Sequence, residues 1–133
     1  MITDILRDFF LSRSAITDKF DPDNIQKWPI ALDIKDYSIL AFRETNNTEQ
    51  TLSDGMPGLD QHSISLIIVS KSPENTLEAA KAVENDLVGY VGSLSASPSV
   101  YCVGIQKVGY SDEYEPDTAA HVGVLSLLFF TRG

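Results

Sequence analysis

The stretch HSISLIIVSKSPENTLEAAKAVENDL, residues 62–87, contains the two clearest elements of the chain, a strand followed at once by a helix. Over His62–Ser70, apolar side chains recur at every second position, which is the period of a β-strand. Ser-Pro-Glu, beginning at Ser72, provides a hydroxyl cap, a proline at the first helical position and an acid in the first turn. Apolar residues then repeat at intervals of three and four, so the predicted helix ends near Gly89 or Gly92.

Five further segments have the periodicity or composition of regular structure. Apolar residues at helical spacing predict a short amphipathic helix from Asp4 to about Arg13. Aromatic, β-branched and other apolar residues predict strands over Tyr37–Glu44, Val100–Tyr110 and Ala119–Thr131, and one short edge strand near Trp28–Asp33. Because the last two long strands are adjacent in sequence, we expect them to form an antiparallel hairpin.

These elements predict one domain over residues 1–133. The fold class is α+β, with a mostly antiparallel sheet of four to five strands and two helices packed on one face. The polar segments 45–61 and 111–118 are interpreted as loops, and the small residues 93–99 as a linker. Long loops in compact domains are usually functional or mobile.

The predicted sheet has more apolar surface than two helices can cover. The final strand places Val122, Val124, Leu128 and Phe130 on one face and Leu125, Leu127 and Phe129 on the other. Strands that are apolar on both faces are typically buried on both. The second face must therefore be covered either by the rest of this chain or by another subunit, and the sequence leaves both alternatives open.

Composition limits the class of partner. The chain has 133 residues, 43% hydrophobic and 22% charged, with a net charge of −9 and a sequence pI near 4.4. Such an acidic surface argues against sequence-specific binding of nucleic acid and against docking on an anionic membrane. The single cysteine excludes an intrachain disulfide, no apolar run approaches the length of a membrane span, and the N-terminus lacks the pattern of a signal peptide. We therefore expect a soluble protein of the cytoplasm.

Motifs for catalysis or for a bound metal are not found. The sequence contains no HExxH, CxxC, EF-hand, P-loop or GxGxxG pattern. Cys102, His62 and His121 could be imagined as a nucleophile set, but a cysteine within a strand is more often buried core. The acidic residues of segment 111–118 lack the spacing of a cation-binding loop. We expect no catalytic, cofactor or metal site and no enzyme, although a small α+β enzyme or ligand-binding domain, with a deep pocket at those three residues, stays a distant alternative.

Three stretches carry a resemblance to a known family. They are DGMPGLDQHSISLIIVS, a Gly-rich loop and central strand; SPENTLEAAKAVENDL, an Ala-rich helix; and YEPDTAAHVGVLSLLFF, an "EPDT" loop entering the final strand. In this order they resemble the tail-terminator, or tail-completion, proteins of long-tailed phages and prophages. The N-terminal helix and the strand YSILAFRE are similar to the same layout, whereas residues 17–35 depart from it.

The resemblance implies a structural virion protein of the tail or neck, assembled in the cytoplasm of the bacterial host. Such a subunit would form a ring, commonly a hexamer, that ends polymerisation of the tail tube and joins it to the head connector, with phage DNA passing through the bore. Expected partners are further copies of the chain, the tail tube protein and the connector or neck proteins. Another neck, head-completion or minor capsid protein is the nearest alternative. The candidate contact residues are Asp54, Gly55, Met56 and Pro57 in the first loop, and Asp112, Glu113, Tyr114, Glu115, Pro116 and Asp117 in the second.

Overall fold

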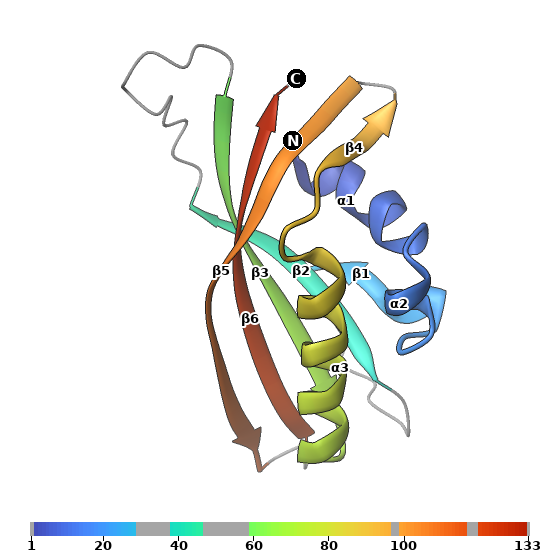
Figure 1. Ribbon diagram of the computed structural model, residues 1–133. Coiled ribbons are helices and arrows are strands. Elements are labelled where there is room, and N and C mark those ends of the chain that lie inside the picture. Colours follow the sequence, from blue (N-terminus) through green and yellow to red (C-terminus); the bar gives the residue numbers. More distant parts are fainter. Residues whose placement is uncertain (1, 29–37, 47–58, 97–98, 117–119, 133) are drawn as a thin grey trace.

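The computed structural model describes residues 2–28, 38–46, 59–96, 99–116 and 120–132. Within these ranges the chain forms helices, a 3-10 turn and strands in an α+β arrangement (Figure 1). In chain order the elements are α1 (Ile2–Leu11), α2 (Ser14–Thr17), η1 (Pro22–Asn24), β1 (Ile25–Lys27), β2 (Ile39–Asn46), β3 (Leu59–Ser70), α3 (Pro73–Leu87), β4 (Gly92–Ala96), β5 (Ser99–Glu115) and β6 (Ala120–Arg132).

The strands form one six-stranded sheet in the order β1-β2-β3-β6-β5-β4. Strand β1 pairs with β2 in parallel, and every other neighbouring pair is antiparallel. The hairpin expected of the last two long strands is confirmed as β5–β6, and β6 lies between β3 and β5. The apolar final strand is therefore central, which explains why both of its faces are apolar.

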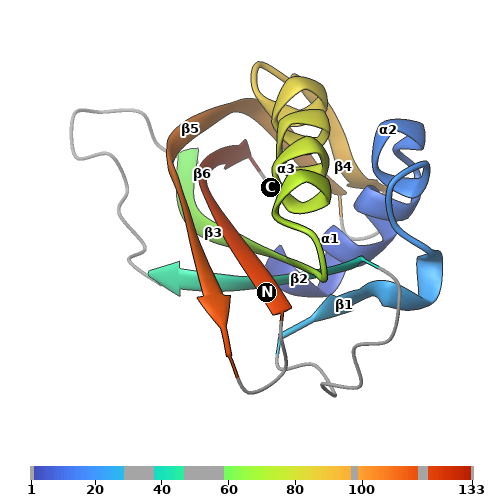
Figure 2. The same cartoon turned by 90° about the horizontal axis from the view of Figure 1, so that it is seen from below.

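The three α-helices lie on the inner, concave side of the curled sheet, and α3 lies across β3 and β6 (Figures 1 and 2). Helix α1 contacts both β1 and β4, the two outermost strands, so it bridges the edges that the curl brings toward each other. The main core fills this concavity. Its largest buried side chains include Phe10 from α1, Leu87 from α3, Phe42 from β2, Leu66 from β3 and Phe129 from β6.

A smaller apolar cluster lies on the opposite, outer face. Ile67 and Val69 alternate along β3 with residues of the main core, and they pack with Ile39, Ala41 and Ala120. All five are buried within the single chain. The second face is therefore covered in part without another subunit, on the side of β2 and the start of β6.

The observed sheet corrects the prediction in detail. It has six strands and is mixed, because the short β1 is parallel to β2, and the short helix α2 follows α1 as a third helix. Segment 93–99 was predicted as a linker, which is wrong for residues 93–96: they belong to β4, the edge strand beside β5. Only Leu94 of β4 is buried, so its sequence has little of the apolar alternation that marks a strand.

Several strand boundaries also differ. Strand β2 continues to Asn46 and β3 begins at Leu59, so residues 45–46 and 59–61 of the predicted loop 45–61 belong to strands. Strand β5 continues to Glu115, so the acidic residues after Tyr110 extend a strand and do not form a loop. Their pairing with β6, from Ser111↔Val124 to Glu115↔Ala120, provides the backbone partners that outweigh the low strand propensity of acidic residues. The edge strand expected near Trp28–Asp33 is found earlier, as β1, and residues 29–33 lie outside the described part of the chain.

Candidate functional site

The end of the β5–β6 hairpin contains all of the candidate contact residues that the structure describes. We call this region, Ser111–Pro116 with Ala120 and His121, the hairpin end. Asp112, Glu113, Tyr114 and Glu115 lie on β5 and Pro116 follows in a turn, all of them exposed to solvent. The other candidates, residues 54–57 and 117, lie outside the described residues.

The inner side of the hairpin end forms a shallow pocket against the first turn of α3. Its volume is about 230 Å³ and its lining residues are Pro73, Thr76, Asp112, Glu113, Tyr114 and His121. The rings of Tyr114 and His121 lie 4.9 Å apart between centroids, tilted by 48°. This pairing is cross-strand, since Tyr114 and His121 are register partners. Two aromatic rings and the Asp112 carboxylate thus share one accessible surface.

Thr76 fixes the helix against the hairpin end, and sequence reasoning gave it no role. Its hydroxyl is buried and lies 2.5 Å from the Ser70 hydroxyl. The same hydroxyl lies within hydrogen-bond distance of two carbonyl oxygens, that of Ser72 at 3.1 Å and that of His121 at 3.3 Å, and it can donate its one proton to either. The position of α3 on the start of β6 is therefore set by polar contacts as well as by apolar packing, which holds the pocket in one shape.

The electrostatics of the hairpin end are dominated by acids. Burial raises the pKa of the Tyr110 hydroxyl, and the negative charge of Asp112 raises it further. Asp112 and Gly123 are register partners, so this carboxylate lies on the inner side, whereas Glu113 lies on the side of Val122. The hairpin end therefore presents negative charge from both faces of the sheet, a surface that suits a basic partner.

The outer face of β6 is the second surface of interest. We call Val122, Val124, Ser126, Leu128 and Phe130 the outer row, because they share one side of the strand. All five are partly exposed, in contrast to the fully buried residues that alternate with them. On the neighbouring strand, Val108 lies in a β-bulge between Lys107 and Gly109 and is 62% exposed. The outer row is thus an apolar strip that the chain covers only in part.

The three residues considered for catalysis are not brought together. His62 on β3 is the register partner of Phe129 on β6, and Phe129 is eight residues from His121 along that strand. At the usual rise of a strand, the two histidines therefore lie roughly 25 Å apart. The His62 Nδ1 atom lies 2.6 Å from a carboxylate oxygen of Glu44. Cys102 is wholly buried in the main core, and this burial raises the pKa of its thiol. The imagined nucleophile set is therefore not assembled.

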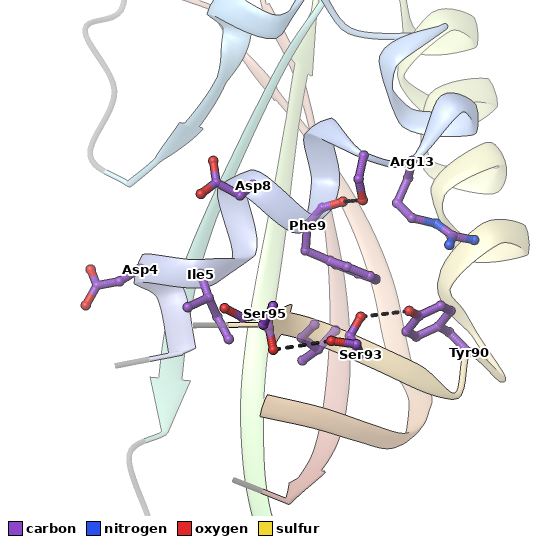
Figure 3. A pocket seen from close by; sticks show the side chains of 11 residues that line it. Asp4, Ile5, Asp8, Phe9, Arg13, Tyr90, Ser93 and Ser95 are labelled. Atoms are coloured by element: carbon purple, nitrogen blue, oxygen red, sulfur yellow. Dashed lines mark hydrogen bonds between the residues drawn. The ribbon is translucent and has the colours of Figure 1, made fainter. Parts of the chain in front are cut away.

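A larger concavity lies elsewhere, between α1 and β4 (Figure 3). It has a volume of about 560 Å³ and none of Cys102, His62 and His121 lines it. Within the described ranges, no three His, Cys, Asp or Glu side chains are grouped as metal ligands. In those same ranges no helix has the length and apolarity to cross a membrane.

Comparison with known proteins gives one kind of likeness. Neither a protein-family model nor a curated protein matches the sequence. Among solved structures, the fold is similar to that of a chain in the virion of a native gene transfer agent particle, with a TM-score of 0.59 and 14% sequence identity. The alignment covers 99% of this chain and 92% of the other. The protein is thus an α+β domain whose fold is similar, over almost its whole length, to that of a chain in a virion.

Proposed function

We propose that this chain is a structural virion protein of a tailed, phage-like particle, and that it forms the ring that caps the tail tube. The observation that carries the proposal is the fold likeness to a virion chain over 99% of this chain. The resemblance of three sequence stretches to tail-terminator proteins supports it separately, because that resemblance depends on residues and the fold likeness depends on backbone shape. The ring would end tube polymerisation and present a surface to the head connector.

Two unlike surfaces support ring formation. A ring of identical subunits uses heterologous contacts, in which one patch of a subunit meets a different patch of the next. The acidic hairpin end and the apolar outer row are such a pair of patches, and both lie on the β5–β6 hairpin. In this proposal the outer row contributes to the contact between copies, and the hairpin end contacts a neighbouring copy, the tail tube protein or the connector.

The net charge of −9 is compatible with a ring whose bore passes DNA. Repulsion between an acidic wall and the phosphates prevents the genome from adhering during its passage. The ring size proposed from the resemblance is a hexamer, located in the tail or neck of the particle.

The proposal is tested by mixing the purified protein with tail tubes of the same particle. We expect light scattering after size-exclusion chromatography to show either a ring or a monomer that assembles on tube ends. The variant Glu113→Lys, which reverses one exposed charge on β5, should weaken capping of the tubes. Glu78→Lys is the matched control, because Glu78 is exposed on α3 away from the hairpin end. A strict monomer that ignores the tubes would count against the proposal.

Another neck or head-completion role predicts a different phenotype. Electron micrographs of particles lacking this protein separate the two. Tails of abnormal length identify a terminator, because nothing ends tube growth. Headless tails of normal length identify a joining protein instead.

A further inference from the structure

The outer row of β6 ends in a patch that is both aromatic and basic. Arg132 follows Phe130 by two residues on β6 and so shares its face of the sheet, and Tyr101 on β5 is the register partner of Arg132. The Arg132 guanidinium lies 5.8 Å from the centre of the Tyr101 ring. Both side chains are exposed, that of Tyr101 to 41%. We call Tyr101, Leu128, Phe130 and Arg132 the basic end of the outer face.

The charge of Arg132 is not compensated within the part of the chain that the structure describes. Three other cations, Arg13, Lys27 and Lys107, each lie 2.6–2.9 Å from a carboxylate oxygen. Arg132 forms no such salt bridge with a described residue, although the chain has a net charge of −9. Its charge is therefore available to a carboxylate of another molecule. Arginine and tyrosine are also among the residue types that contribute most to binding at protein interfaces.

The pocket at the hairpin end has the groups that recognise a guanidinium. Asp112 contributes an exposed carboxylate that forms no salt bridge with a described residue, and Tyr114, 54% exposed, contributes a ring beside that of His121. Arginine forms paired hydrogen bonds with carboxylates and stacks on aromatic rings. The pocket volume of about 230 Å³ is below the usual range for small-molecule sites, about 300–1,000 Å³. The pocket therefore suits one inserted side chain better than a small-molecule ligand.

These two surfaces lie at opposite ends and on opposite faces of the β5–β6 hairpin. His121 of the pocket and Arg132 are eleven residues apart along β6, roughly 35 Å at the usual rise of a strand (Figure 1). They cannot therefore meet within one chain. The pocket lies on the inner side and Arg132 on the outer side, so one copy can contact two neighbours at once. Such a contact is heterologous, and a ring results where its rotation closes.

We propose that the basic end of one copy binds in the hairpin-end pocket of the next copy, with the Arg132 guanidinium on the Asp112 carboxylate and beside the Tyr114 ring. The occupant is assigned to a second copy because this chain itself carries both halves of the contact, an arginine without a carboxylate and a carboxylate pocket without a cation. The inference rests on the proposed ring and names the two surfaces that meet in it.

An exchange of charges tests the pairing, with capping of tail tubes of the same particle as the measurement. Arg132→Asp and Asp112→Arg should each weaken capping about tenfold, because like charges then meet in every contact. The double variant, in which the two charges are exchanged, should recover most of that loss. Lys81→Glu is the matched control, because Lys81 is exposed on α3 outside both surfaces, and it should leave capping within about twofold. Urea unfolding shows that each variant is folded.

Disulfide crosslinking locates the contact without depending on charge. In a chain that carries both Tyr114→Cys and Arg132→Cys, the two new thiols are too far apart to join within one molecule. The native Cys102 is wholly buried in the core. Oxidation of capped tubes should therefore join successive copies into a ladder that ends at the full ring, whereas either single variant should give no ladder.

The outcomes separate this inference from the proposed function. Undiminished capping by Arg132→Asp, a double variant as weak as the single ones, or no ladder on capped tubes would overturn the inference and leave the ring in place. Wild-type protein that neither forms a ring nor caps tubes would overturn the proposed function, and the inference with it.

Discussion

Gly123 is a position at which one added methyl group should lower the stability of the protein. It lies on the inner side of β6, beneath α3. A Cβ atom added there would lie 2.8 Å from the Thr76 Cγ2 atom and would also meet the Tyr110 hydroxyl. Contacts between carbon atoms are favourable only at about 3.5–4.0 Å. Thr76 cannot withdraw freely, because its hydroxyl is held by Ser70 and the His121 carbonyl.

We expect Gly123→Ala to lower the free energy of unfolding by about 1–2 kcal/mol. Overpacking of a close contact costs about 1–3 kcal/mol. Replacing glycine by alanine returns about 0.4–1 kcal/mol, because the unfolded chain loses conformational freedom. The control is Gly104→Ala on β5, where an added Cβ meets nothing within 4 Å, so this variant should be neutral or slightly stabilised. Urea unfolding followed by circular dichroism measures both.

A second substitution identifies the cause. Thr76→Ser removes the Cγ2 methyl group and keeps the hydroxyl with its hydrogen bonds. In the double variant with Gly123→Ala, the loss in the free energy of unfolding should be smaller than the sum of the two single losses by about 0.5–1.5 kcal/mol. Equal stability of Gly123→Ala and Gly104→Ala would refute the steric argument. Strictly additive single effects would show that Thr76 is not the group in contact.

Substitutions at four further positions test polar contacts and the burial of Cys102. Arg13→Ala removes a pair of hydrogen bonds to Asp86 and should lower the free energy of unfolding in urea by about 1 kcal/mol. Lys27→Ala removes an exposed ion pair and should cause no measurable change. Ser72→Ala should cost about 1 kcal/mol, because this hydroxyl caps α3, but Ser72→Gly only a few tenths by the same measurement. Burial raises the pKa of the Cys102 thiol above its ordinary value of 9.0. The difference in the free energy of unfolding between the native chain and Cys102→Ala should therefore be constant below pH 9. At higher pH the native chain should lose stability, because the thiol then ionises in the unfolded state but not in the folded one. A gap between the two proteins that is independent of pH would contradict this.

Sequence patterns predicted well the elements whose apolar side chains recur with the period of a strand or a helix. Strand β3 alternates between two apolar clusters, and α3 begins with a serine cap whose oxygen accepts from the Asn75 amide at 3.3 Å. Both signals are local, so they can be detected without knowledge of neighbours. The antiparallel β5–β6 hairpin was predictable for the same reason, because its two strands are consecutive.

The errors arise where distant segments decide the structure. Strand β4 has one buried side chain, Leu94, and its other residues are small, so only its pairing with β5 identifies it as a strand. The acidic end of β5 was predicted as a loop because of its composition, yet Asp112–Glu115 pair residue by residue with β6. The contacts of Thr76 with the His121 carbonyl and of Arg13 with Asp86 span 45 and 73 residues, and a local pattern cannot show them.

The distribution of buried surface bears on how a ring of such subunits would assemble. The main core and the smaller outer cluster are complete within one chain, so the isolated subunit can be stable before it meets another. The outer row is only partly exposed, and the hairpin end is charged, so neither surface forces association in dilute solution. In the proposed role, the end of the tail tube promotes ring closure by binding several subunits at once. A ring that closes at that end would stop tube growth there, which is the role proposed for this chain.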